Sequence, residues 1–116
     1  MSKVSVIIPT YNRGALVLRA LRSVFAQDHA VDQVIVVDDG STDDTIERVE
    51  RDFPKVELIV QTNHGVSHAR NRGIERARNE WLAFLDSDDE WITDKIEKQF
   101  VLLKESNFKL QFIHTN

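Results

Sequence analysis

Apolar residues follow two different periods along this chain. Short runs that are almost wholly apolar, or that alternate with polar residues, have the pattern of β-strands. Between these runs, apolar residues recur three or four positions apart, which is the pattern of amphipathic helices. The predicted strands are residues 4–8, 34–37, 56–60, 81–85 and 108–113. The predicted helices carry their apolar stripes within residues 16–25, 46–53, 66–77 and 96–103.

The order of these segments predicts the architecture. Strands that are nearly continuous apolar runs, separated by helices of about three turns, are typical of a parallel sheet covered on both faces. We therefore expect an α/β fold with a doubly wound, mostly parallel sheet and helices on both faces, in one domain over residues 1–116. Pro9 is expected to end the first strand, and Ser41 is placed to cap the second helix.

A polar loop follows each of the first four predicted strands. The carboxyl ends of parallel strands meet at one edge of a sheet, and ligands bind there near the point at which strand order reverses. We therefore expect these loops to form one binding site, whereas a set of unrelated solvated turns is the alternative. The loops are residues 10–12, 38–41, 63–65 and 86–89.

The loop after the fourth strand concentrates negative charge. Asp86, Asp88, Asp89 and Glu90 fall within five positions. Carboxylates this close repel one another where water is scarce, and oxygen ligands suit a hard cation such as Mg²⁺, Mn²⁺ or Ca²⁺. A solvated acidic turn is the alternative. A calcium loop of the EF-hand type fits the spacing of these acids, but Trp91 stands where that motif needs glycine.

Composition narrows the function classes. The chain has 116 residues, a formal net charge of −4 and no cysteine. The negative charge argues against a nucleic-acid partner, and the lack of cysteine excludes disulfides and thiolate chemistry. The first apolar run is too short for a signal peptide or a membrane span. We expect a cytoplasmic protein, with any membrane association made through regions outside this chain.

Four segments together carry a resemblance to a known family. They are VSVIIPTYN at residues 4–12, VDDGSTD at 37–43, GVSHARNRG at 65–73 and FLDSDD at 84–89. In this order and at this spacing, they resemble the N-terminal half of a family 2 glycosyltransferase of the GT-A fold. Each segment is weakly diagnostic alone, but the four in register cover nearly the whole chain.

The resemblance implies a role for each matching residue. The substrate would be a nucleoside-diphospho-sugar, with Asp39 accepting a hydrogen bond from the base and Arg70 reaching the nucleotide from the third helix. Asp86-Ser87-Asp88 matches the DxD motif, in which the first acid faces the ribose and the last holds a divalent metal, Mn²⁺ or Mg²⁺, that bridges the phosphates. The implied substrate-binding residues are Pro9, Thr10, Tyr11, Asn12, Asp39, Arg70, Asp86 and Ser87, with Asp88 as the metal ligand.

Structural roles remain open for some of these residues. Asp38 and Asp39 are also placed to cap the second helix together with Ser41, and Arg70 is able to pair with a surface acid instead of a nucleotide. Such a pair would contribute little to stability. The position of Arg70 within the segment Ala69-Arg70-Asn71 favours the nucleotide-binding role.

The resemblance also implies that part of the enzyme lies outside this chain. The later half of such a domain carries the acceptor surface and the catalytic base of inverting members, and no second acid cluster follows Asp89 to supply one. We therefore expect a truncated donor-binding part that transfers little or no sugar alone. A UDP-sugar is the favoured donor, and the acceptor, saccharide or lipid-linked, is unassigned. An exposed sheet edge at residues 108–113 would allow a homodimer.

Two alternatives belong to other classes of protein. One is a non-catalytic nucleotide- or metal-binding α/β domain. The other is a phosphoacceptor domain of the receiver type, which also has an acid pair after an apolar strand. Receiver domains place that pair after the first strand, however, where this chain has Pro9-Thr10-Tyr11.

Overall fold

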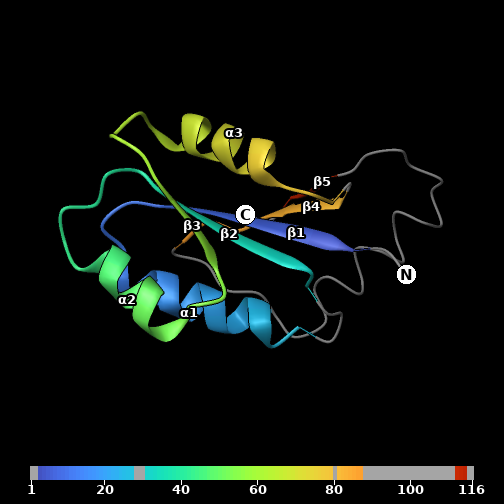
Figure 1. Ribbon diagram of the computed structural model, residues 1–116, viewed down its shortest axis with the longest axis horizontal. Coiled ribbons are helices and arrows are strands. Elements are labelled where there is room, and N and C mark those ends of the chain that lie inside the picture. The colour runs from blue at the N-terminus through green and yellow to red at the C-terminus, as the bar shows by residue number, and fades with distance from the viewer. Residues whose placement is uncertain (1–2, 28–30, 80, 88–111, 115–116) are drawn as a thin grey trace.

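One parallel sheet organises the molecule. The computed structural model describes residues 3–27, 31–79, 81–87 and 112–114. Each pair of neighbouring strands is parallel, and the strand order is β3-β2-β1-β4-β5 (Figure 1). The strands are β1 (Val4–Thr10), β2 (Gln33–Asp38), β3 (Glu57–Val60), β4 (Trp81–Phe84) and β5 (Phe112–His114). Strand order therefore reverses between β1 and β4, which is where an open α/β sheet binds its ligands.

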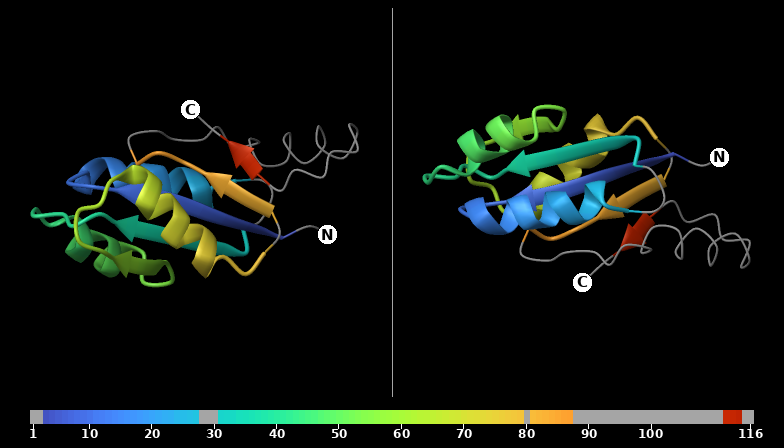
Figure 2. Two further views of the ribbon diagram at one scale, coloured as in Figure 1. Left: turned by 90° about the horizontal axis from the view of Figure 1, so that it is seen from above. Right: turned by 90° about the horizontal axis from the view of Figure 1, so that it is seen from below.

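Helices cover both faces of the sheet. In Figures 1 and 2, α1 and α2 lie together against one face and α3 lies against the other. The helices are α1 (Gly14–Phe25), α2 (Thr45–Asp52) and α3 (Val66–Arg76). The predicted doubly wound α/β architecture is confirmed, and the predicted helix within residues 96–103 lies outside the described residues.

Successive side chains of β1 point to opposite faces of the sheet, so the hydrophobic core has two separate parts. All of its residues are buried, and Val6 and Ile8 face the cluster with α1 and α2, whereas Ile7 faces the cluster with α3. On α3, Ala69 and Gly73 supply the contact surface. A Cβ on Gly73 would lie 2.4 Å from Cγ2 of Ile7, so only glycine allows α3 to approach the sheet this closely.

Two predicted details of the local structure are wrong. β1 does not end at Pro9 but continues to Thr10. Pro9 pairs with Val37 of β2, whereas pairing between β1 and β4 stops at Ile7, so proline stands where β1 no longer pairs with β4. Ser41 does not cap the second helix, because α2 begins only at Thr45 and the Ser41 hydroxyl donates to Asp38 instead.

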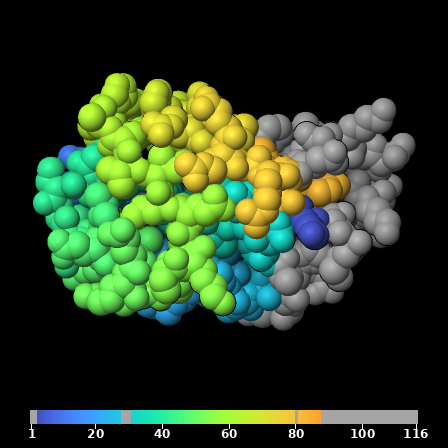
Figure 3. Space-filling model, viewed as in Figure 1, coloured from blue at the N-terminus to red at the C-terminus, as the bar shows by residue number. Residues whose placement is uncertain are grey.

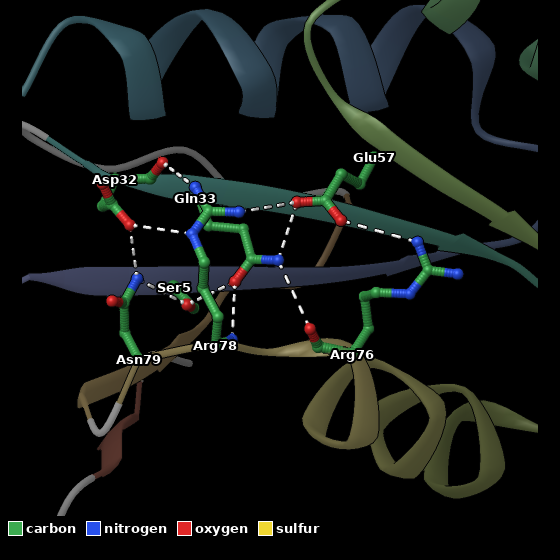
Figure 4. A network of polar contacts seen from close by, with 7 residues as sticks. All are labelled: Ser5, Asp32, Gln33, Glu57, Arg76, Arg78 and Asn79. Carbon is green, nitrogen blue, oxygen red and sulfur yellow. Dashed lines mark hydrogen bonds and ion pairs between the residues drawn. The ribbon is translucent and has the colours of Figure 1, made fainter.

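A polar network ties the strands together at the edge opposite their carboxyl ends. The buried Gln33 amide lies at its centre: Oε1 accepts from the Ser5 hydroxyl at 2.7 Å and the Arg78 N–H at 2.9 Å, and Nε2 donates to Glu57 at 2.7 Å (Figure 4). Nε2 also lies 3.4 Å from the Arg76 carbonyl oxygen. The end of α3 is thereby fastened to three strands.

Within the described residues, β3 forms one edge of the sheet. The surface between α2 and α3 in Figure 3 belongs to the chain around β3, and Val60 at its end is 52% exposed. At the opposite edge, β5 overlaps the end of the strand predicted at residues 108–113 and extends one residue beyond it, to His114. The dimer predicted through that edge stays a prediction.

Candidate functional site

A cavity of about 720 Å³ opens at the carboxyl ends of β1, β2 and β4. It lies beside the reversal of strand order, as the topology predicts. Three of the four predicted loops and the first turns of α3 contribute to its wall. The lining residues are Pro9, Thr10, Tyr11, Asn12, Arg13, Asp39, Val66, Ala69, Arg70, Asp86 and Ser87. All of the substrate-binding residues that the sequence predicts are therefore brought together.

Asp39 holds the loop between β3 and α3 in place. Its Oδ1 accepts from Gln61 Nε2 at 2.8 Å and the His64 N–H at 2.7 Å. Its Oδ2 accepts from the Gly65 N–H at 3.0 Å and from Asn63 Nδ2 at 3.2 Å. Burial alone would raise the pKa of Asp39, but the hydrogen bonds from His64, Gln61 and Gly65 outweigh it and hold the pKa below its ordinary value. The carboxylate is thus charged and fixed at the cavity wall.

Asn12 joins the loop after β1 to the loop after β2. Its backbone is left-handed, with φ of 50°, and its N–H donates to Ser41 Oγ at 2.8 Å. Its Oδ1 accepts from the Thr42 N–H at 2.8 Å and from the Asp43 N–H at 3.3 Å. The side chain therefore shapes the cavity by holding two loops together.

Asp38 is buried at the end of β2 and forms hydrogen bonds with Ser41 in the loop that follows. Its Oδ2 accepts from the Ser41 N–H at 2.8 Å, and its Oδ1 accepts from the Ser41 hydroxyl. Asp38 does not line the cavity. The structure therefore favours a structural role for Asp38, in which it fixes Ser41 rather than capping α2.

An ion pair spans the cavity between α3 and the segment after β4. Arg70 Nη2 lies 3.0 Å from Asp86 Oδ1, with side-chain exposures of 32% and 40%. Arg70 Nε and the hydroxyl of Thr10 are both buried without a hydrogen-bond partner in the described part of the chain. Buried polar atoms of this kind normally have a partner, so both have the capacity to bind a ligand.

The sequence did not single out three residues of the cavity wall. Arg13 continues the loop after β1, and within the described residues its side chain makes no hydrogen bond or ion pair. Val66 and Ala69 reach the wall because they occupy the first turns of α3. The polar sequence of residues 10–13 was the available signal for Arg13, whereas the apolar pair gives no signal apart from helix periodicity.

His64 and His68 belong to the segment that surrounds Asp39, but neither of them lines the cavity. The rings of His64 and His68 are stacked with centroids 4.8 Å apart, and His68 Nδ1 lies 3.0 Å from Gln61 Oε1. Gln61 in turn donates to Asp39, so this pair supports the loop around that carboxylate.

The predicted metal site is only partly described. Asp86 offers a half-exposed carboxylate, whose Oδ2 makes no hydrogen bond with the described residues, and such an oxygen suits Mg²⁺ or Mn²⁺. Asp88 lies outside the described residues. In the parts of the chain that the structure describes, no group of three metal-ligating side chains occurs, and no helix is long and apolar enough to cross a membrane.

Comparisons with known proteins identify the family of this chain. The family model described as "Glycosyl transferase family 2" matches residues 5–112. The chain therefore belongs to glycosyl transferase family 2. It is 41% identical over 117 residues to an uncharacterised glycosyltransferase of Rickettsia conorii, covering 99% of this chain and 19% of that protein. It is 38% identical over 113 residues to the putative teichuronic acid biosynthesis glycosyltransferase TuaG of Bacillus subtilis, covering 94% and 45%.

Solved structures of glycosyltransferases share the fold. S. aureus TarS 1-349 in complex with UDP-GlcNAc matches with a TM-score of 0.78 and 35% identity, over 90% of this chain and 32% of that one. The mannosyltransferase PcManGT of Pyrobaculum calidifontis, in complex with GDP-Man and Mn²⁺, matches with a TM-score of 0.75 and 32% identity, over 86% and 32%. This chain thus spans less than half the length of each of these four proteins.

Proposed function

We propose that this chain forms the donor-binding part of a glycosyltransferase that moves a sugar from a nucleoside-diphospho-sugar to an acceptor hydroxyl. The proposal rests on one observation. A single cavity, at the reversal of strand order, is lined by Thr10, Asp39, Arg70 and Asp86. Membership of family 2 supports it, as do the nucleotide sugars in the TarS and PcManGT structures.

In this proposal the nucleoside lies between the loop after β1 and the start of α3. Tyr11 and Val66 are 43% and 50% exposed and offer apolar surface to a base. Asp39 accepts a hydrogen bond from the base, and the Thr10 hydroxyl gains a partner that the described chain does not give it. Asp86 faces the ribose, so its pairing with Arg70 orients the carboxylate for that contact.

Asp88 completes the DxD motif and would hold the divalent ion, Mn²⁺ or Mg²⁺. When bound, this ion stabilises the negative charge that develops on the departing nucleoside diphosphate. The carboxylate of Asp86 is the other acid of the motif, and Ser87 between them is buried against the cavity wall. The Mn²⁺ in the PcManGT structure supports a divalent cofactor.

The acceptor and the catalytic base are not assigned to any residue of this chain. General-base catalysis needs a carboxylate within hydrogen-bond reach of the acceptor hydroxyl. We therefore propose that the 116-residue chain alone binds the donor weakly and transfers little or no sugar. Robust turnover by this chain would contradict that part of the proposal.

Calorimetric titration tests the donor site. UDP, GDP and dTDP are titrated into the chain with Mn²⁺, with EDTA, and with the variants Asp88→Ala and Glu75→Ala. We expect one class of nucleotide to bind with a requirement for both Mn²⁺ and Asp88, whereas Glu75→Ala, an exposed change on α3 outside the cavity wall, leaves binding intact. A folded chain that binds none of the three would contradict the proposal.

A further inference from the structure

We propose that His64 and His68 form a second cation site, which binds a transition-metal ion such as Zn²⁺ through one imidazole nitrogen of each ring. The site is separate from the acid-rich loop after β4, because neither histidine lines the cavity. It also differs in chemistry, since imidazole suits Zn²⁺, Ni²⁺ and Cu²⁺, whereas carboxylates suit Mg²⁺ and Mn²⁺. The inference goes beyond the proposed function and does not depend on nucleotide binding.

The two rings lie as close together as imidazoles that share one metal ion. His64 precedes Gly65, the residue before α3, and His68 follows four positions later in the first turn of the helix. A spacing of four brings two histidines to one side of the chain, as in helical zinc sites. Their ring centroids are 4.8 Å apart. Zn–N bonds of about 2.0–2.1 Å at nearly tetrahedral angles place two ring centroids about 5 Å apart, so the separation fits a shared ion.

A chain of hydrogen bonds fixes the tautomer of His68. Its Nδ1 lies 3.0 Å from Oε1 of the buried Gln61. The amide nitrogen of Gln61 donates to Asp39 Oδ1 at 2.8 Å, so Oε1 faces His68 as an acceptor. His68 therefore donates from Nδ1, and its neutral ring carries the lone pair on Nε2.

His64 has the same tautomer because of a different acceptor. Its Nδ1 lies 2.7 Å from the carbonyl oxygen of Thr62, which is only able to accept. His64 therefore also donates from Nδ1 and carries its lone pair on Nε2. A hydrogen bond from one ring nitrogen to a carbonyl oxygen is the arrangement that orients metal-binding histidines in proteins.

Both Nε2 atoms are accessible to an ion from solvent. The two histidines are exposed, and within the described residues their ring hydrogen bonds are made through Nδ1. Those bonds go to the neighbouring residues Gln61 and Thr62, so the Nε2 atoms lie on the sides of the rings away from these acceptors. Zn²⁺ prefers four ligands, and water supplies those that the two rings do not.

Asp39 offsets the positive charge at the start of α3. The positive end of the helix dipole opposes a cation that binds beside the first turn. The Asp39 carboxylate accepts from the His64 N–H at 2.7 Å and is linked to the His68 ring through Gln61. Its full negative charge exceeds the partial charge of the helix end. The dipole therefore does not exclude a cation from the histidine pair.

Titration with Zn²⁺ tests the inference. The titration uses the Asp88→Ala chain with Mg²⁺ in excess, so that the acid-rich loop does not compete for Zn²⁺. We expect one Zn²⁺ to bind, and His64→Ala and His68→Ala each to weaken its binding by at least about tenfold. Ser67→Ala is the matched control, because Ser67 is exposed on the same turn, and it should leave binding unchanged. A folded chain that binds no Zn²⁺, or binding that survives both histidine changes, would overturn the inference.

NMR spectra of the imidazole nitrogens test the geometry directly. Without metal, and at a pH where the rings are neutral, both His64 and His68 should carry the proton on Nδ1. Added Zn²⁺ should shift the Nε2 resonances of both rings together, and the shifts should saturate at one equivalent. A proton on Nε2 of either neutral ring, or a shift confined to one ring, would overturn the shared site.

Discussion

Arg70 Nη2 lies 3.0 Å from Asp86 Oδ1, which joins a helix on one face of the sheet to the segment that follows β4. Both side chains line the cavity, and both are about one-third exposed or more. Solvent therefore screens the pair, and its contribution to folding is small. Its position at the cavity indicates a role in binding instead.

We expect the variants Arg70→Gln and Asp86→Asn to separate stability from binding. Each should change the free energy of unfolding by less than about 1 kcal/mol, because exposed ion pairs contribute little. Each should weaken nucleotide binding by about tenfold or more, because a hydrogen bond that involves a charged group is lost. Urea unfolding and calorimetric titration measure the two effects.

Arg76→Gln is the control for these variants. Arg76 is on the same helix and lies 3.5 Å from Glu57 at the opposite edge of the sheet, away from the cavity. It should leave nucleotide binding unchanged. If Arg70→Gln and Arg76→Gln behaved alike in titration, the role of Arg70 in the cavity would have to be abandoned.

Arg13 supplies a second cation to the cavity, and no described residue pairs with it. Arg13→Gln should leave stability within about 0.5 kcal/mol of the original chain, as is usual for a surface substitution. It should weaken the binding of UDP, and the difference should shrink as salt screens the lost charge. Arg72→Gln on α3 serves as the control, since Arg72 does not line the cavity. Equal effects of the two variants would show that only overall charge matters.

The lowered pKa of Asp39 makes stability depend on pH. Burial opposes the charged form, but hydrogen bonds from His64, Gln61 and Gly65 hold the folded-state pKa below 3.8. The stabilisation is therefore fully present above the pKa of the unfolded chain and is lost as the pH falls through the lower folded value. The difference in unfolding free energy between the original chain and Asp39→Asn should shrink from about pH 7 toward about pH 3.

The comparison with Asp39→Asn is needed because other carboxylates share this behaviour. Asp32, Asp43 and Asp52 also have pKa values below the ordinary one, Asp32 chiefly because of a hydrogen bond from Asn79. Their contributions are common to both proteins and cancel. A difference that stays constant over the whole acid range would mean that Asp39 is not stabilised as a carboxylate.

Gly73→Ala should destabilise the fold although alanine favours helix. The gain in helix propensity is about 1 kcal/mol. The new Cβ would lie 2.4 Å from Ile7 Cγ2, and overpacking of this kind costs about 1–3 kcal/mol. Pairing Gly73→Ala with Ile7→Ala removes the clash, so the double variant should lose less stability than the sum of the single ones. Additive losses in urea unfolding would contradict this contact.

Much of the fold could be predicted because the relevant signals are local. The apolar runs define the strands and the period of three to four defines the helices. Parallel topology then places the ends of β1, β2 and β4 at one edge, so Thr10, Asp39 and Asp86 had to be neighbours. The sequence by itself therefore determined the architecture, the location of the cavity and most of its wall.

Only the tertiary structure decided what each polar side chain does there. Asn12 binds the loop after β2, and Ser41 binds Asp38 instead of capping a helix. Asp39 is saturated by donors that lie more than twenty positions along the chain, from Gln61 to Gly65. These hydrogen bonds join residues distant in sequence, and no local pattern specifies which of several polar groups will be the partner. Packing of α3 on β1 selects among them, because it fixes where the loop before the helix must lie.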